Sequence, residues 1–197
     1  MIVDRYYYNQ LNKNEQIIYR CFYKGIMDRK DIIPIPVKGM MTQEVFNRIF
    51  EAMTRDNPLI YYLNQSTCSL ATDVLGHTAI CPQYFFSRER IYEYNRKIEK
   101  AVNELAADLK LKEGTEYEKE LKVHDWLCSF VSYDYDGADI NDPVRFMEAH
   151  NIVGVFAHHR AQCEGIAKAV KVLLNAVDIK CIVVTGKADG NDQNGPH

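Results

Sequence analysis

Apolar side chains recur at helical spacing over most of this chain, and the pattern predicts a mainly helical protein with a few short strands. In the first part of the sequence it predicts helices over 8–28 and 42–57, with Thr42 as the N-cap of the second. Stretches without helical spacing are expected to be extended chain or short strands: 32–36, 59–63 and 80–86. Residues 1–86 are therefore expected to form a small α+β unit.

From residue 87 onwards the helical patterns become longer. The spacing predicts three helices in succession: 87–110, 115–136 and 142–159, the last breaking near Gly154. Thr115 and Glu118 match a capping box at the start of the second of these. A further helix is predicted over 163–177, then a buried strand over 180–186 and a polar loop over 187–197.

The helix predicted over 163–177 begins with a cysteine where Ser, Thr, Asp or Asn would be usual. Its apolar positions share one face: Cys163, Ile166, Ala167, Val170, Leu173, Leu174 and Val177. Cys163 then has two interpretations. As the first residue of a core stripe it is a buried structural thiol, since free cysteine is often buried. In the first helical turn it meets unpaired N–H groups, which favour the nucleophilic thiolate and can stabilise an oxyanion.

Two further features favour the nucleophile. Gly165 costs about 1 kcal/mol relative to alanine inside a helix, which indicates a close approach to the first turn. The helix over 163–177 and the strand over 180–186 each cover roughly 20 Å, so an antiparallel strand would end level with Cys163. The polar loop then leads to His197. A cysteine at a helix start and a histidine on a neighbouring strand form the nucleophile–base pair of thiol catalysis.

Composition narrows the class of protein. Hydrophobic residues make up 47% of the chain and charged residues 26%, with a net charge of −3, which is ordinary for a globular protein. There is no basic stripe for nucleic acid and no apolar run long enough to cross a membrane, and the first residues lack the pattern of a signal peptide, so partners other than nucleic acid and membrane are expected. The six cysteines include no CxxC pair, which argues against a zinc ribbon or a dithiol redox motif. Reduced thiols and a cytoplasmic location are therefore expected.

At this point the sequence resembles a known family. Three segments carry this resemblance: "HDWLCSFVSYDYD" (124–136), the stretch 150–186 and "NGPH" (194–197). Together they are similar to the transglutaminase-like superfamily of papain-type thiol enzymes, above all to bacterial members with a Cys-Glu-Gly-Tyr-Ala segment. Here that segment is 163–167, with Ile166 at the tyrosine position. The resemblance covers about 88–197. It implies an α+β fold whose core, 87–197, packs a nucleophile helix on an antiparallel sheet after the unit 1–86.

The resemblance implies that Cys163 is the nucleophile and His197 its general base. The expected activity is acyl transfer or hydrolysis at carboxamide or peptide bonds of a protein or peptide substrate, through a thioester and without metal or cofactor. In the family a third residue, usually Asp, orients the histidine from the next strand. This sequence stops at His197, so a fragment or a natural truncation without the C-terminal strands is expected. The alternative is a catalytically inactive binding or structural module of the same fold.

For other residues near the thiol, the sequence allows more than one role. Gln162 supplies either a side-chain amide to the oxyanion or a solvent-facing side chain. Trp126, Tyr133 and Tyr135 are candidates for the cleft, although packing is the better interpretation for Trp126. Arg160 and Glu164 flank the thiol with opposite effects on its ionisation.

A rival motif is the dipeptide His124-Asp125, which metal-dependent phosphohydrolases use on their helices. Such a site needs further ligands on neighbouring helices. Those available here are His150, His158 and Asp139, and no spacing singles them out.

Overall fold

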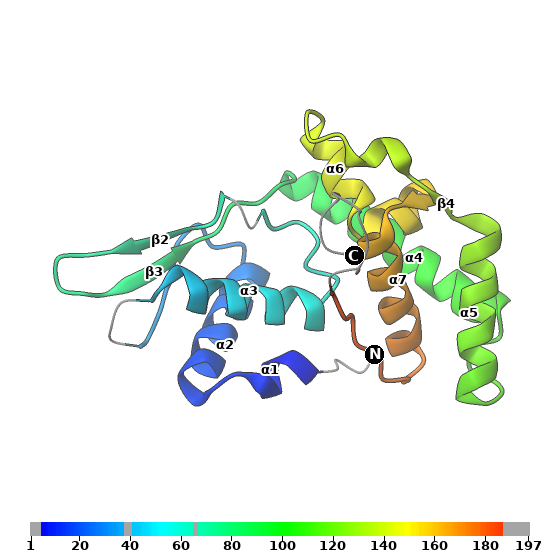
Figure 1. Ribbon diagram of the computed structural model, residues 1–197, viewed down its shortest axis with the longest axis horizontal. Coiled ribbons are helices and arrows are strands. Elements are labelled where there is room, and N and C mark those ends of the chain that lie inside the picture. Colours follow the sequence, from blue (N-terminus) through cyan, green and yellow to red (C-terminus); the bar gives the residue numbers. More distant parts are fainter. Residues whose placement is uncertain (1–4, 38–40, 65–66, 187–197) are drawn as a thin grey trace. The chain divides into compact units, whose positions relative to one another are not determined.

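The computed structural model describes residues 5–37, 41–64 and 67–186 (Figure 1). These residues fall into two compact units, 5–87 and 88–186. Helices dominate both units, and an antiparallel sheet is present, which confirms the α+β class expected from the sequence.

In the unit 5–87, two helices replace the single one expected over 8–28. They are α1 (Tyr6–Gln10) and α2 (Lys13–Met27). The chain breaks between them because Asn12 caps α2. Its side chain accepts the N–H of Glu15, and the Glu15 carboxylate accepts the N–H of Asn12, both at 3.0 Å. This reciprocal capping box needs extended backbone at Asn12, which a continuous helix cannot supply.

Helix α3 (Gln43–Asp56) begins where the sequence predicts. The Thr42 hydroxyl caps it by accepting the N–H of Val45 at 3.3 Å. Aromatic rings join α2 to α3, with centroids 5.9 to 6.2 Å apart: Phe22, Phe46 and Phe50. All of these rings are buried, so this cluster forms the core of the unit.

A three-stranded antiparallel sheet completes this unit, in the order β1 (Ile33–Pro34), β3 (Thr78–Cys81), β2 (Ser69–Thr72). Strand β1 confirms the extended chain expected over 32–36, and β3 overlaps the start of the strand expected over 80–86.

The strand expected over 59–63 was wrong. Only Leu63 pairs there, in an isolated bridge to Tyr84, because the consecutive side chains of 60–63 are all buried instead of alternating. Strand β2 was missed because most of its side chains are exposed, so it carries no apolar pattern.

The unit 88–186 starts with two long helices, α4 (Arg88–Asp108) and α5 (Glu116–Phe130). The predicted capping box is confirmed at the start of α5: the Thr115 hydroxyl accepts the N–H of Glu118 at 3.3 Å, and the Glu118 carboxylate accepts that of Thr115 at 2.7 Å. Among the residues that the structure describes, no helix has both the length and the apolar character needed to cross a bilayer.

Short elements follow α5, which ends six residues before the predicted limit of 136. They are β4 (Ser132–Tyr133), the 3-10 helix η2 (Tyr135–Ala138), α6 (Pro143–Ala149), the π-helix η3 (Gly154–His158) and β5 (Arg160–Ala161). The longer helix α7 (Cys163–Ala176) follows them. The helix expected over 142–159 is thus divided. Asn151 interrupts it, because its side-chain oxygen accepts the N–H of Val153 at 2.8 Å while its amide donates to the Met147 carbonyl.

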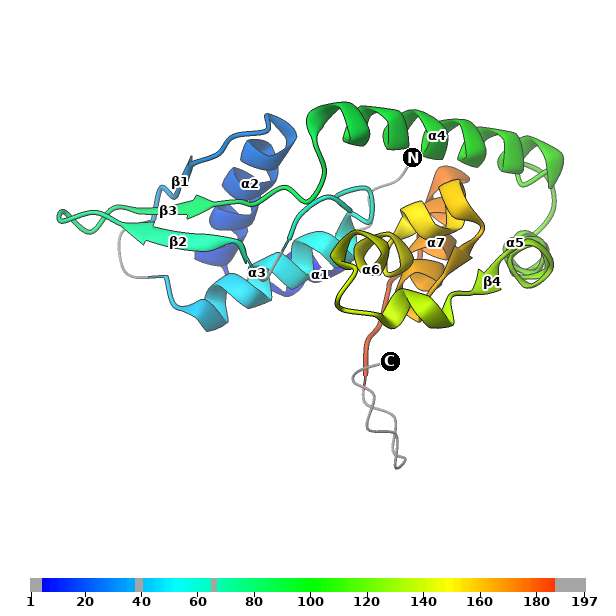
Figure 2. The same cartoon turned by 90° about the horizontal axis from the view of Figure 1, so that it is seen from above.

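Helix α7 packs against α4, α5 and η3 (Figure 2). The strands described in this unit, β4 and β5, pair in parallel, with Tyr133 opposite Ala161. The antiparallel sheet expected beside the nucleophile helix is therefore not found within 88–186. Its place against α7 is taken there by helices and by the β4–β5 pair.

Candidate active site

Cys163 is the first residue of α7, and its side chain is exposed to solvent. Gln162 precedes it in extended conformation, and no described side chain caps the helix there. The first intrahelical bond runs from the N–H of Ile166 to the Gln162 carbonyl at 3.0 Å, so the N–H groups of 163–165 face the helix start. This exposure excludes the interpretation of Cys163 as a buried core thiol.

The buried face of α7 is rotated from the stripe expected on it. Buried positions include Gly165, Ala169, Val172, Leu173 and Leu174. Half-buried positions include Ile166, Ala167 and Val170, which were expected in the core. The smallest side chains face inward because neighbouring backbone comes close to the helix on that side.

Gly165 shows which backbone this is. A Cβ at Gly165 would lie 2.6 Å from the Ala149 carbonyl oxygen and 2.8 Å from that of Asn151. The N–H of Gln162 also donates to the Ala149 carbonyl at 2.8 Å. The close approach inferred from the sequence is therefore real, but the approaching group is the end of α6 and not a substrate. This contact fixes the position of the first turn of α7.

Strand pairing brings a tyrosine to the thiol. Tyr133 on β4 lies opposite Ala161 on β5, two residues before Cys163. From there the Tyr133 hydroxyl lies beside Cys163, close enough for the thiol and the backbone N–H of Cys163 to shift the pKa of Tyr133. Burial raises the pKa of Tyr133, and the negative charge of an ionised Cys163 raises it further. The Tyr133 hydroxyl therefore stays protonated and able to donate next to a thiolate.

Gln162 is buried, so the solvent-facing alternative for its side chain is wrong. Its amide nitrogen donates to the Asp134 carbonyl at 2.6 Å, and its amide oxygen accepts from the Tyr133 hydroxyl at 3.3 Å. The side chain thus ties β4 to the start of α7. One of its amide protons is engaged by the Asp134 carbonyl.

The buried carboxylate of Asp134, near the start of α7, was not predicted from the sequence. Asp134 is 6% exposed and accepts from Arg145 at 3.0 Å and from the N–H of Gly137 at 3.1 Å. Arg160, expected to act on the thiol, lies 3.7 Å from the same carboxylate. The sequence did carry a signal for this carboxylate, since Asp134 lies between Tyr133 and Tyr135. A carboxylate buried between such side chains needs a partner of opposite charge.

Glu164 is also paired. Its carboxylate lies 2.6 Å from the Lys168 ammonium one turn further along α7. Both charged groups expected to influence Cys163 thus have partners of opposite charge.

The remaining candidate residues lie apart from this contact. Trp126 is buried on α5 and its ring neighbours those of Phe130 and His159, at 6.2 and 6.4 Å, which is a packing role. Tyr135 is 82% exposed and its ring lies 4.9 Å from that of Tyr133, so it lies at the surface against that ring. His197 lies outside the described residues.

The return segment after α7 differs from prediction. Residues 180–186 form no regular strand. Side chains of α7 bind their backbone instead: Lys171 donates to the Cys181 carbonyl, and Asn175 donates to the Ile179 carbonyl at 2.8 Å. These bonds hold the segment against the helix as irregular chain.

The direction of this segment is nevertheless antiparallel to α7. Its contacts move back four residues on the helix, from Asn175 to Lys171, while the return chain advances two, from Ile179 to Cys181. Four residues of helix and two residues of extended chain each span roughly 6 Å, so the two segments advance at the same rate in opposite directions. At that rate the return chain would be level with Cys163 at about Thr185.

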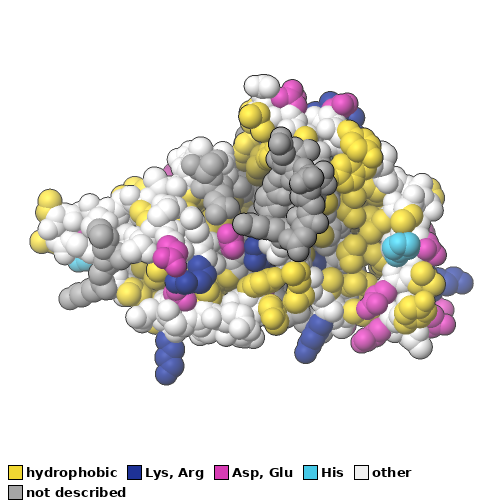
Figure 3. Space-filling model, in the orientation of Figure 1, with side chains coloured by type: hydrophobic (Ala, Val, Ile, Leu, Met, Phe, Trp, Pro, Cys, Tyr) yellow, Lys and Arg dark blue, Asp and Glu magenta, His cyan; other side chains and the backbone are white. Residues whose placement is uncertain are grey.

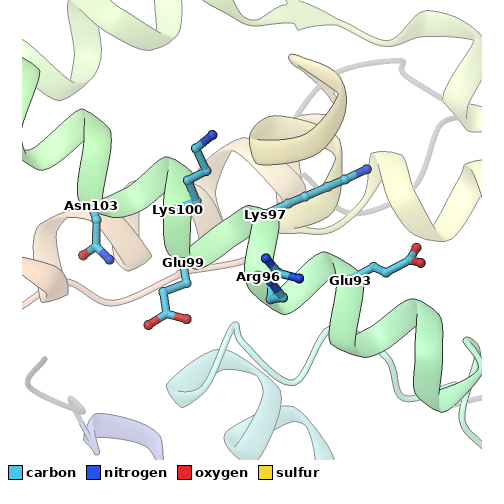
Figure 4. Close-up of a pocket in the computed structure, with 6 residues that line it drawn as sticks. All are labelled: Glu93, Arg96, Lys97, Glu99, Lys100 and Asn103. Carbon is cyan, nitrogen blue, oxygen red and sulfur yellow. The ribbon is translucent and has the colours of Figure 1, made fainter.

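A hollow on α4 offers no competing site. Its lining residues all belong to that helix and all are polar: Glu93, Arg96, Lys97, Glu99, Lys100 and Asn103 (Figure 4). They are the solvent-facing side of an amphipathic helix whose other side is buried.

The residues of the rival phosphohydrolase motif have other partners. His150 is hydrogen-bonded to the Phe146 carbonyl at 2.8 Å, His158 lies 3.4 Å from Glu148, and Asp139 accepts from Asn141. Within the described ranges, no three His, Cys, Asp or Glu side chains are grouped closely enough to hold a metal ion. The ligand set that this motif requires is therefore not assembled there.

One family profile matches part of this chain. The profile of the transglutaminase-like superfamily matches residues 103–197, a range that includes both Cys163 and His197. A solved structure of a TGase is similar with 16% identity and a TM-score of 0.35, over 73% of this chain. The chain spans only 41% of the length of that structure. No curated protein matches this sequence.

Proposed function

Because residues 103–197 belong to the transglutaminase-like superfamily, we propose that this chain is a thiol enzyme acting on carboxamide or peptide bonds. The observation that carries the proposal is the exposed thiol of Cys163 at the first position of α7, in contact with the Tyr133 hydroxyl. A protein or peptide substrate reaches such a surface position without entering a closed cavity.

In the first step the Cys163 sulfur attacks the carbonyl carbon of the substrate. The carbonyl π electrons move to oxygen, and the N–H groups of the first turn of α7 stabilise this oxyanion. Collapse of the intermediate re-forms the carbonyl and breaks the carbon–nitrogen bond. The nitrogen takes a proton and departs as ammonia or an amine, leaving a thioester on Cys163.

His197 is the proposed proton carrier. Its imidazole takes the thiol proton and returns it to the leaving nitrogen. The antiparallel return of residues 179–181 along α7 supports this role, because the chain there runs back toward the end of the helix that holds Cys163. The thioester is then resolved by an amine, which gives a crosslink, or by water, which gives hydrolysis.

Alkylation by iodoacetamide at pH 6 tests the nucleophile. We expect Cys163 to react about tenfold faster in the folded chain than the same residue in the urea-unfolded chain, measured by site-resolved mass spectrometry. The unfolded chain is the proper reference, because it separates activation by the fold from simple exposure. Cys181, half-buried, serves as an internal control. Equal rates at Cys163 in the folded and unfolded chain would contradict the proposal.

Tyr133→Phe tests the hydroxyl beside the thiol. When Cys163 is ionised, the single hydroxyl proton is donated to the sulfur, so we expect alkylation of Cys163 to slow by about tenfold, since a hydrogen bond to a charged acceptor contributes roughly 1.5 kcal/mol. When the thiol is protonated, the same proton is donated to the buried Gln162 oxygen, so urea unfolding at acidic pH should show a loss of about 1 kcal/mol.

Tyr135→Phe is the matched control for this variant. It removes a hydroxyl from the neighbouring, far more exposed ring and is expected to leave the rate at Cys163 unchanged. Equal effects of the two variants would mean that the Tyr133 hydroxyl has no special relation to the thiol.

A further inference from the structure

A second cysteine of this unit also has an imidazole beside it. On α5, the Cys128 sulfur lies 3.6 Å from Nε2 of His124, one helical turn earlier. The other ring nitrogen of His124, Nδ1, lies 3.1 Å from the carboxylate of Asp125. Thiol, imidazole and carboxylate thus follow one another in hydrogen-bonding contact.

This arrangement is open to solvent and has no packing role. The side chains of His124 and Asp125 are 69% and 67% exposed, and Cys128 is exposed as well. Apolar and charged side chains lie at the surface over α5 (Figure 3). By contrast, Cys21, Cys68, Cys81 and Cys181 are all half-buried, and burial raises the pKa of Cys68. Unlike these four thiols, the Cys128 thiol is both exposed to solvent and in contact with a histidine that can act as its base.

We propose that Cys128 is a site of covalent modification by small disulfides, with His124 as its base. His124 takes the thiol proton, and the sulfur attacks one sulfur of the disulfide. The disulfide bond breaks, a mixed disulfide forms on Cys128, and the departing thiolate takes the proton from the imidazole. Asp125 is a positioning residue: it accepts from Nδ1–H and thereby presents Nε2 as the free base. This site is independent of Cys163 and of the proposed function.

The charge around the site selects among disulfides. Asp125 and Glu120, which precedes His124 by one helical turn, are both exposed carboxylates on α5, and Lys122, one turn before Asp125, offsets only part of their charge. A cationic disulfide is attracted to such a surface, whereas an anionic one is repelled. We therefore expect cystamine to modify Cys128 several-fold faster than glutathione disulfide at low ionic strength, with the difference falling as salt is added.

The experiment treats the full chain with cystamine at pH 7 and follows each cysteine by mass spectrometry. His124→Gln is expected to slow modification of Cys128 by about tenfold, less than the loss of an enclosed catalytic base because this pair is exposed. His77→Gln is the matched control, since His77 forms an exposed pair with Asp73 at 2.8 Å in the other unit. It should leave the rate at Cys128 unchanged.

The role of Asp125 has its own readout. With a neutral disulfide such as hydroxyethyl disulfide, which the carboxylate charge does not attract, Asp125→Ala is expected to lower the rate at Cys128 by less than His124→Gln does. Asp125→Asn should restore most of that rate, because the amide oxygen still accepts from Nδ1–H. The proposal is overturned if Cys128 in His124→Gln reacts within twofold of the unchanged chain while circular dichroism is preserved. It is equally overturned if Cys128 in the unchanged chain reacts no faster than Cys181.

Discussion

Cys163→Ala is expected to abolish turnover, by a factor on the order of 10⁶ as for the loss of other catalytic nucleophiles, and to leave folding nearly intact. The residual rate is small because no other group forms the thioester. Stability is preserved because the thiol is exposed at the first position of α7, where substitutions change the free energy of unfolding by about 0.5 kcal/mol or less. Ammonia release from casein in the presence of a small primary amine, and urea unfolding, measure the two effects.

Cys128→Ala provides the matched control, since it also removes an exposed thiol from a helix of the same unit. We expect it to retain full turnover. A loss of more than 2 kcal/mol in Cys163→Ala would show a core residue and contradict the exposed position. Rapid alkylation of Cys163 without ammonia release from any substrate would instead favour the alternative of a binding module with this fold.

Gly165→Ala is expected to destabilise the unit 88–186 by about 2 kcal/mol, although alanine is normally the better helix former. Alanine gains roughly 1 kcal/mol in helix propensity, but its Cβ would lie 2.6 Å from the Ala149 carbonyl oxygen and 2.8 Å from that of Asn151. Both opposing atoms are backbone, so no side chain can swing aside. Gly165→Val should be more damaging still. Urea unfolding followed by circular dichroism measures the loss.

Gly186→Ala is the control, because a Cβ at Gly186 meets nothing within 4 Å. It should change stability by about 0.5 kcal/mol or less. If Gly165→Ala proved as stable as Gly186→Ala, the end of α6 would not be held against the start of α7. The same backbone contact positions the first turn, so Gly165→Ala should also slow alkylation of Cys163.

Local signals in the sequence predicted the helix starts well. Thr42 and the pair Thr115 and Glu118 were recognised as caps because a cap is made by residues within one turn of each other. Asn12, in contrast, was missed although it forms the same kind of capping box, because the apolar spacing on both sides suggested one continuous helix. Periodicity reports the face of a helix but not whether the helix is interrupted.

Errors near the candidate site had a different origin. The stripe on α7 was correct at Leu173 and Leu174, which are buried, but wrong in the first two turns. Spacing alone gives weight to large apolar residues, whereas Gly165 and Ala169 face inward there to admit neighbouring backbone. The segment 180–186 has the composition of a strand, but its carbonyls at Ile179 and Cys181 are bound by side chains of α7. Which partner a carbonyl finds depends on what folds against it.

The sequence by itself determined the helical architecture, the position of Cys163 at a helix start and the similarity of residues 103–197 to the transglutaminase-like superfamily. These properties depend on neighbours along the chain, or on a motif read in order. Only the tertiary structure decided that Tyr133 and Gln162 meet the thiol, because strand pairing joins residues about thirty positions apart. Contacts of that range follow from packing and strand register, which no local pattern encodes.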